Sequence, residues 1–145
     1  MITLRIARPD DAKPLVKLFR ASRALLTFLP ELHTEAEDLG SVRNVLLPTH
    51  RVTIAELDGR LAGFMAEEDG WINQLYLDPG VLRGGIGSAL IADAKSRNES
   101  ITLWCFAENH RARSFYEKQG FVAVETTDGS TNEAKRPDVR YLWKP

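Results

Sequence analysis

A glycine-rich segment in the middle of the chain has the residue types of a phosphate-binding loop, and it reads Leu82-Arg83-Gly84-Gly85-Ile86-Gly87-Ser88-Ala89. Glycines let the backbone approach a ligand closely and turn its N–H groups toward it. The residues that follow have helical periodicity, and a helix N-terminus adds roughly half a positive charge. Together these features favour a phosphate or a pyrophosphate, and Arg83 could add a direct charge contact.

Two well-known phosphate loops do not fit this segment. A Walker A loop ends in Gly-Lys-Ser/Thr, and no lysine follows the glycines here. A dinucleotide fingerprint needs a third glycine at the position that Leu90 occupies. From the loop alone, a plain glycine-rich turn without a ligand is the other interpretation.

Composition narrows the class of protein. The 145 residues include 19 Lys and Arg against 20 Asp and Glu, so the net charge is −1 and no basic excess is present to neutralise nucleic-acid phosphates. Hydrophobic residues make up 43% of the chain, which excludes disorder of the whole chain. No apolar run reaches the roughly 20 residues that span a bilayer, so we expect no membrane segment. The length predicts a single domain over residues 1–145.

The cysteine and histidine content indicates neither a disulfide framework nor a metal site. Cys105 is the single cysteine, which favours a reducing, cytoplasmic setting. His33, His50 and His110 do not have the spacing of metal ligands, so we expect no metal. Cys105 falls in an apolar strand, where we expect a packing role.

Hydrophobic periodicity predicts the element order β-α-α-β-β-β-α-β-α-β-β, an α+β pattern. Strands are expected over residues 2–7, 51–57, 60–66, 71–77, 101–106, 121–125 and 139–143. Helices are expected from Asp10 or Asp11 to about Leu29, from Thr34 to Pro48, from the glycine segment to about Asn98, and from Asn109 to Gly120. The dipeptides Asp58-Gly59 and Asp69-Gly70 predict tight turns, so residues 51–77 form an antiparallel meander.

Two of these stretches resemble the motifs of one protein family. The strand Trp71–Leu77 with Asp78-Pro79 and the glycine loop resembles motif A of the GNAT superfamily of acyl-CoA-dependent N-acyltransferases. Residues 103–121 are similar to its motif B, Asn-x-x-Ala-x-x-Phe-Tyr-x-x-x-Gly-Phe, which is represented here by Asn109, Ala112, Phe115, Tyr116, Gly120 and Phe121. The resemblance covers essentially the whole chain. It implies a mixed central sheet of about seven strands with about four flanking helices. The sheet is antiparallel at its start and has a splayed parallel pair in its middle.

The resemblance implies acetyl transfer from acetyl-CoA to a primary amine by direct attack in a ternary complex, without metal. The pantetheine arm would lie between the splayed strands against the backbone of Leu75, Tyr76 and Leu77. The N–H of Leu77 would then face the thioester oxygen, where negative charge grows. Tyr116 occupies the position of the general acid that protonates the thiolate. Its alternative role is that of a core aromatic residue.

The rest of motif B implies further contacts with the coenzyme. Asn109 is expected to cap its helix and to face the pantetheine arm, beside Ala112 and Phe115. In the loop, Leu82 stands where the family usually has Gln or Arg. Binding relies mainly on backbone N–H groups, so we expect coenzyme binding to survive this departure.

The attacking amine must lose a proton, and the sequence shows no obvious carboxylate that would act as the general base. Many relatives carry Glu or Asp where this chain has Asn73, which cannot act as a base but can hold a water molecule. Glu37, Glu67 and Glu133 are the other candidate acceptors, and transfer of the proton through water to bulk solvent is an equal alternative.

The acceptor site is expected at the connection between the first two helices, which contains His33 and precedes Glu37. The polar loop that holds Glu133 borders the same cleft. The acceptor would be an amine of a small molecule or of a peptide, and a homodimer is a candidate assembly because dimers are common in the family. A catalytically inactive acyl-CoA-binding or partner-binding protein of this fold is the alternative function.

Overall fold

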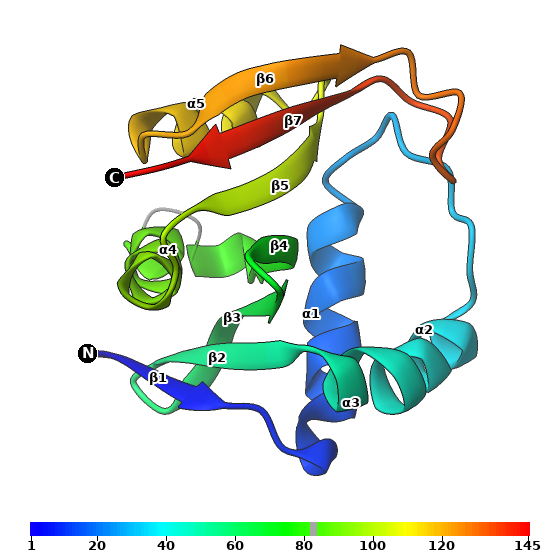
Figure 1. The fold of residues 1–145 in the computed structure, drawn as a ribbon. Coiled ribbons are helices and arrows are strands. Elements are labelled where there is room, and N and C mark those ends of the chain that lie inside the picture. Colours follow the sequence, from blue (N-terminus) through cyan, green and yellow to red (C-terminus); the bar gives the residue numbers. More distant parts are fainter. Residues whose placement is uncertain (82–83) are drawn as a thin grey trace.

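The computed structural model describes residues 1–81 and 84–145 and is built around one seven-stranded sheet (Figure 1). The strands lie in the order β1-β2-β3-β4-β5-β7-β6. Their bounds are β1 (Ile2–Ile6), β2 (Arg51–Leu57), β3 (Arg60–Glu68), β4 (Trp71–Leu77), β5 (Ile101–Phe106), β6 (Val122–Thr127) and β7 (Asp138–Trp143). Neighbouring strands are antiparallel except for β4 and β5, which run parallel. The predicted mixed sheet is confirmed.

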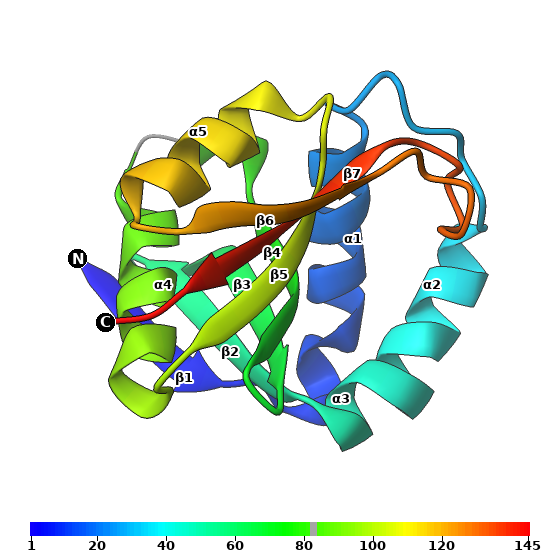
Figure 2. The ribbon, with the colours of Figure 1, turned by 45° about the horizontal axis from the view of Figure 1, so that its top comes forward.

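Helices cover both faces of the sheet (Figure 2). One face carries α1 (Ala12–Arg23) and a continuous helical stretch made of α2 (Glu35–Ser41), the π-helical η2 (Val42–Leu46) and α3 (Leu47–Thr49). The other face carries α4 (Ile86–Arg97) and α5 (His110–Lys118). Short 3-10 turns, η1 (Pro9–Asp11) and η3 (Pro79–Val81), precede α1 and the glycine loop.

Each face has its own apolar core. On the α1 side, Leu15, Val16, Ile54 and Phe64 are almost fully buried together with Val42 and Leu46. On the α4 side, the core includes Ile86, Leu90, Ala94, Leu103, Tyr116 and Tyr141. Ile86, Leu90 and Ala94 form the helical stripe that the sequence predicts for α4.

Both predicted tight turns are confirmed. Asp58 and Gly59 have φ values of 51° and 82°, and Asp69 and Gly70 have 52° and 81°. A two-residue hairpin whose central residues both have positive φ matches the twist of the strands it joins. The meander β2-β3-β4 follows from these local signals.

Helix α1 ends at Arg23, six residues before the predicted Leu29. The chain after it forms the α1–α2 loop (residues 24–34), in which the Phe28 ring packs edge-on against Phe106 at the end of β5 (centroids 5.8 Å apart). The guanidinium of Arg136 lies 5.9 Å from the centre of the same ring. This long-range packing replaces the last helical turns, since helix propensity is a weak preference that tertiary contacts override.

Pro48 does not stop the second helical stretch, which continues to Thr49. In η2 the Leu47 N–H donates to Val42 O, one residue further back than in an α-helix. This shift places Pro48 in the first turn of α3, where a missing N–H costs little.

An extra residue in β4 separates it from β5. Ala66 of β3 lies opposite Gln74, and the next residue, Glu67, lies opposite Ile72, so Asn73 is the bulged residue. A bulge bends its strand and increases the local twist. The pairing of β4 with β5 accordingly ends after Trp71↔Thr102 and Ile72↔Leu103. Figure 1 shows β5, β7 and β6 as a group set apart from β1–β4.

We predict that Gly63→Ala destabilises the protein by about 2 kcal/mol, because overpacking forces neighbouring atoms to move. A Cβ at Gly63 would lie 2.7 Å from Leu77 Cδ2 and 3.0 Å from Tyr76 O. The free energy of unfolding in urea measures this effect. Gly40→Ala is the matched control, since its Cβ meets only Asn44 Nδ2 at 4.0 Å inside α2. The control should stabilise the protein by about 0.5–1 kcal/mol, and equal losses in both variants would contradict the packing argument.

Candidate active site

The N-terminus of α4 presents backbone N–H groups that have no acceptor among the described residues. Gly85 precedes the helix in the left-handed conformation (φ 80°), and the first helical bond runs from Ala89 N–H to Gly85 O at 3.0 Å. The N–H groups of residues 86–88 therefore have no helical partner, and they point out of the positive end of the helix. Such a terminus binds phosphate groups.

The structure reduces the number of loop N–H groups that could contact a phosphate. The Gly84 N–H donates to Val81 O at 3.1 Å, and the Ala89 N–H is taken by the helix, so neither is free for a phosphate. The hydroxyl of Ser88 accepts a hydrogen bond from Gln119 Nε2 at 3.0 Å. The predicted roles of Leu82 and Arg83 lie outside the described residues.

The edge of β4 that faces β5 is open beyond the bulge. Asp78 N–H donates to Ala62 O of β3 at 2.8 Å, and successive strand residues direct their N–H groups to opposite edges. Leu75 and Leu77 therefore direct their N–H groups toward the open edge, and their contact with the pantetheine arm stays a prediction. The backbone of Tyr76 is directed to β3 instead, which corrects its expected contact with the pantetheine arm.

Tyr116 of α5 is 8% exposed and lies in an aromatic cluster. Its ring centre is 5.3 Å from that of Phe115, 5.7 Å from Phe121 and 6.1 Å from Tyr141. Burial raises the pKa of Tyr116 well above its ordinary value, and its electrostatic neighbours Cys105 on β5 and Tyr76 on β4 raise the pKa further. Tyr116 is thus a protonated phenol close to the two diverging strands, and it is also the core residue that the alternative role describes.

The other motif B residues bring α5 close to α4. Asn109 Oδ1 accepts a hydrogen bond from the Ala112 N–H at 3.2 Å, which confirms the predicted helix cap. Among the described residues no hydrogen bond engages the amide NH2 of Asn109, which could therefore donate to a ligand. The Phe115 ring lies against Gly87, where a Cβ would be 3.0 Å from Phe115 Cζ. Gly87 therefore permits the close approach of the two helices.

Asn73 contacts His50, which the sequence analysis considered only as a metal ligand. Its Nδ2 lies 2.9 Å from Nε2 of His50. The Thr49 hydroxyl donates to Val45 O at 2.5 Å, so it accepts from His50 Nδ1 at 2.8 Å. His50 Nε2 then accepts from Asn73. The sequence did not predict this contact, because the two residues are far apart in the chain: His50 precedes β2 whereas Asn73 belongs to β4.

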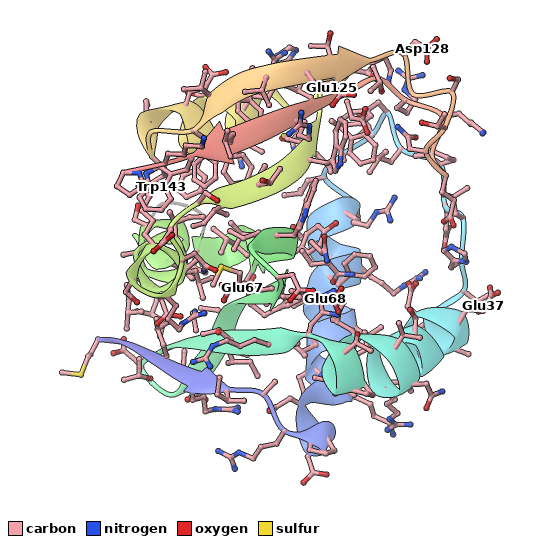
Figure 3. All side chains as sticks on the ribbon, viewed as in Figure 1. Glu37, Glu67, Glu68, Glu125, Asp128 and Trp143 are labelled. Atoms are coloured by element: carbon pink, nitrogen blue, oxygen red, sulfur yellow. The ribbon has the colours of Figure 1, made fainter. Side chains whose placement is uncertain are left out.

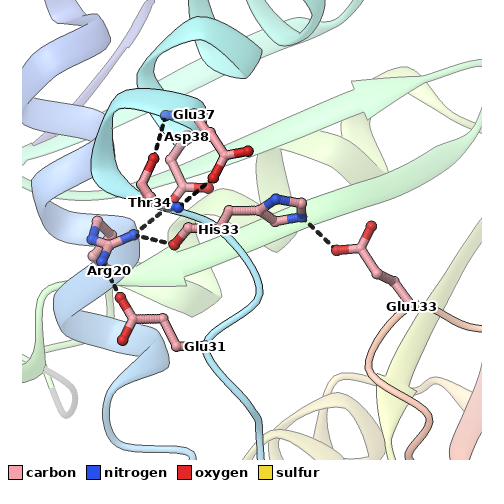
Figure 4. A network of polar contacts seen from close by, with 7 residues as sticks. All are labelled: Arg20, Glu31, His33, Thr34, Glu37, Asp38 and Glu133. Carbon is pink, nitrogen blue, oxygen red and sulfur yellow. Dashed lines mark hydrogen bonds and ion pairs between the residues drawn. The ribbon is translucent and has the colours of Figure 1, made fainter.

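The α1–α2 loop contacts the β6–β7 loop (residues 128–137) through His33 and Glu133, whose Nε2 and Oε1 atoms are 2.6 Å apart (Figure 4). Arg20 of α1 holds the loop from the other side. Its guanidinium donates to Glu31 at 2.6 Å, to Asp38 at 2.7 Å and to the His33 carbonyl at 3.2 Å. The structure thus brings two of the three predicted acceptor residues into direct contact, and the third, Glu37, is near enough for its charge to help raise the pKa of His33.

Glu37 and Glu67 have structural partners. Glu37 accepts the Thr34 N–H at 2.8 Å while Thr34 Oγ1 accepts the Glu37 N–H at 3.1 Å, the predicted capping box. Figure 3 shows Glu37 at the outer edge of α2. Glu67 is 7% exposed and forms a bidentate ion pair with Arg97 (3.0 and 2.8 Å), so it is not available as a base for the amine.

A pocket of about 280 Å³ lies between the end of α1 and the α1–α2 loop, and we call it the α1 pocket. Its lining includes Phe19, Arg23, Leu26, Leu29, His33 and Asp38. The Phe19 ring packs edge-on against Tyr76 of β4 (centroids 4.9 Å apart). The pocket therefore adjoins the diverging part of β4 from the α1 side.

Cys105 is buried on β5, and burial raises the pKa of its thiol to about 12. A protonated, buried thiol is a poor nucleophile, in line with the expected packing role.

The residues described in the structure contain no group of three His, Cys, Asp or Glu side chains placed to hold a metal ion. In the same residues, every helix is too short or too polar to cross a membrane.

We predict that Glu133→Gln lowers the pKa of His33, since the contact with Glu133 is the main cause that raises it. A raised pKa means that the contact is fully formed below the ordinary value of about 6.5. The contact weakens as the pH rises through the raised value. NMR titration of the His33 ring measures the midpoint. Glu35→Gln, a nearby exposed change in α2, should leave the midpoint unchanged, and an equal shift in both variants would refute the role of Glu133.

Comparison with known proteins places this arrangement in a family. A model of the acetyltransferase (GNAT) domain matches residues 48–123. The peptidyl-lysine N-acetyltransferase YjaB of Escherichia coli (strain K12) is 33% identical over 124 residues, which are 83% of this chain and 82% of that protein. The peptidyl-lysine N-acetyltransferase YiaC of the same strain is 32% identical over 85 residues, and the match spans 58% of each protein.

Solved structures have the same fold. The solution structure of apo-form YjaB from Escherichia coli matches with a TM-score of 0.81 and 25% identity, over 99% of this chain and 97% of that chain. The PaiA N-acetyltransferase from Thermoplasma acidophilum, crystallised in complex with coenzyme A, matches with a TM-score of 0.77 and 20% identity, over 100% and 99%. From its sequence motifs, its family match and its sheet, the chain belongs to the GNAT superfamily of N-acetyltransferases.

Proposed function

We propose that the protein transfers the acetyl group of acetyl-CoA to the side-chain amine of a lysine in a peptide or protein. The observation that carries this proposal is the open edge of β4 between the unpaired N–H groups of α4 and the buried phenol of Tyr116. The names of YjaB and YiaC as peptidyl-lysine N-acetyltransferases support a lysine acceptor.

The residues present suit coenzyme A. The N–H groups of residues 86–88 fit its diphosphate, because they combine unsatisfied donors with the positive end of α4. The open N–H groups of Leu75 and Leu77 fit the amide-containing pantetheine arm, since a strand edge pairs with any extended amide chain. Bound acetyl-CoA supplies the thioester that the amine attacks.

In the proposed reaction the amine nitrogen forms a bond to the thioester carbon, and the bond from that carbon to sulfur breaks. The Leu77 N–H donates to the carbonyl oxygen as negative charge develops there. The Tyr116 phenol then protonates the departing thiolate, and the phenolate takes up a proton from water, so the proton that the amine loses balances the one that the thiol gains. A water molecule held by Asn73 accepts the proton that the amine loses, and His50 orients the Asn73 side chain through the 2.9 Å contact.

Release of free thiol from acetyl-CoA in the presence of lysine peptides tests this function. Mass spectrometry locates the acetyl group on the lysine side chain, and a panel of small amines forms the comparison. Calorimetry with coenzyme A alone separates two failures. Heat without turnover would indicate an inactive coenzyme-binding protein, whereas no heat would refute the coenzyme site.

We predict that Tyr116→Phe lowers kcat by roughly 100-fold, within the usual contribution of a general acid. The measurement is thiol release at saturating substrates, with coenzyme binding checked by calorimetry. Tyr141→Phe is the matched control because it removes a hydroxyl from the same aromatic cluster, one that contacts Arg113 and Glu117 instead. The control should keep kcat within about twofold, since its hydroxyl transfers no proton in the reaction. Full activity of Tyr116→Phe would exclude the proposed acid.

The raised pKa of Tyr116 predicts the shape of the pH profile. Because burial holds the pKa above the ordinary value of about 10, the phenol keeps its proton throughout the neutral and moderately alkaline range. We expect kcat to show no loss from phenol ionisation up to about pH 10. A decline below that pH in the wild type, absent from the residual activity of Tyr116→Phe, would contradict this assignment.

A further inference from the structure

The α1 pocket has an uneven distribution of charge. Two of its carboxylates, Glu31 and Asp38, are bound by Arg20 at 2.6 and 2.7 Å. The imidazole of His33 is bound by Glu133. Arg20 and His33 therefore bind all three of these carboxylates, and Figure 4 shows Glu133 reaching His33 from the β6–β7 loop.

Arg23 differs from these groups. It is half-buried, it lines the pocket, and within residues 1–81 and 84–145 no carboxylate lies within ion-pair distance of it. Its guanidinium lies over the Phe19 ring, 5.5 Å from the ring centre. This cation–π contact holds the guanidinium against the ring. Among the described residues, no hydrogen bond or ion pair engages its N–H donors.

The positive charge of Arg23 also acts on Tyr76, in the part of β4 that diverges from β5. Burial raises the pKa of Tyr76, and the positive charge of Arg23 opposes that rise. Phe19 links the two residues, because it contacts the Tyr76 ring and lies under the guanidinium. A group held by Arg23 would therefore lie next to the strand along which the acetyl donor is proposed to bind.

We propose that Arg23 selects amine acceptors that carry a carboxylate close to the reacting amine. The inference rests on the proposed function. A planar guanidinium binds a carboxylate through two parallel hydrogen bonds. At about 280 Å³ the α1 pocket is at the small end of ligand sites, so it fits one acidic side chain or the carboxylate of a small amino acid.

Two pairs of acceptors distinguish the source of the carboxylate. The first pair is a lysine peptide with Glu next to the lysine and the same peptide with Gln in its place. The second pair is a free amino acid and its amide. We expect the wild type to prefer the acidic member of at least one pair by about tenfold in kcat/KM, which corresponds to about 1.4 kcal/mol. The preference should fall as the ionic strength rises.

Arg23→Gln should reduce that preference to about one, and Arg23→Lys should retain part of it because the charge remains. Arg43→Gln is the matched control, since Arg43 is an exposed arginine of η2 outside the pocket lining. It should keep the tenfold preference. Thermal melting of each variant confirms that α1 is folded.

The possible results distinguish a failure of selection by Arg23 from a failure of the proposed acetyl transfer. Turnover without a preference in the wild type, or the same preference in Arg23→Gln, would overturn the selection by Arg23 while leaving acetyl transfer in place. Absence of thiol release from every amine would refute the proposed function and the inference with it. A preference confined to the free amino acid would support the selection by Arg23. It would show that Arg23 binds the α-carboxylate of an amino acid rather than the side chain of a neighbouring Glu.

Discussion

Hydrogen bonding between β4 and β5 ends after two residue pairs, and the remaining structure of the candidate site depends on that interruption. Asn73 adds one residue to β4, so the strand bends and its far edge loses its partner. A strand edge with unpaired N–H and C=O groups is normally a liability, because it pairs with other extended chains. Here α4 and α5 flank the opening on one face and α1 flanks it on the other, so an extended ligand of limited length can replace the missing strand.

The two faces of the opening have different chemistry. On the α4 side, glycines remove the side chains that would keep the backbone apart. Gly85 turns the chain into the helix, and Gly87 lets Phe115 approach α4. The result is a helix N-terminus with unsatisfied donors beside a buried phenol, which suits an anionic coenzyme and a thiolate leaving group.

On the α1 side the charges are arranged in pairs. Arg20 joins α1 to the α1–α2 loop, and His33 joins that loop to the β6–β7 loop. These contacts are exposed or partly exposed, and each is individually weak in water. Together they hold a loop whose Phe28 ring packs on Phe106, and other residues of that loop, among them Leu26 and Leu29, line the α1 pocket. Arg23 is the cation in this group whose charge has no carboxylate partner among the described residues.

The sequence by itself determined the features that depend on near neighbours in the chain. The hairpins at Asp58-Gly59 and Asp69-Gly70, the caps at Thr34 and Asn109, and the helical stripe of α4 all follow from local backbone preferences. Spaced motifs around the glycine loop and Tyr116 were sufficient to identify the family and the expected sheet.

Only the tertiary structure decided the features that depend on residues distant in sequence. The end of α1 at Arg23, the bulge at Asn73 and its contact with His50 each require strands or loops that meet after folding. The ion pair of Glu67 with Arg97 likewise removed a carboxylate that the sequence left as a candidate base. Residue type shows what a side chain can bind, but partners and burial decide whether it is free to do so, and both are set by packing.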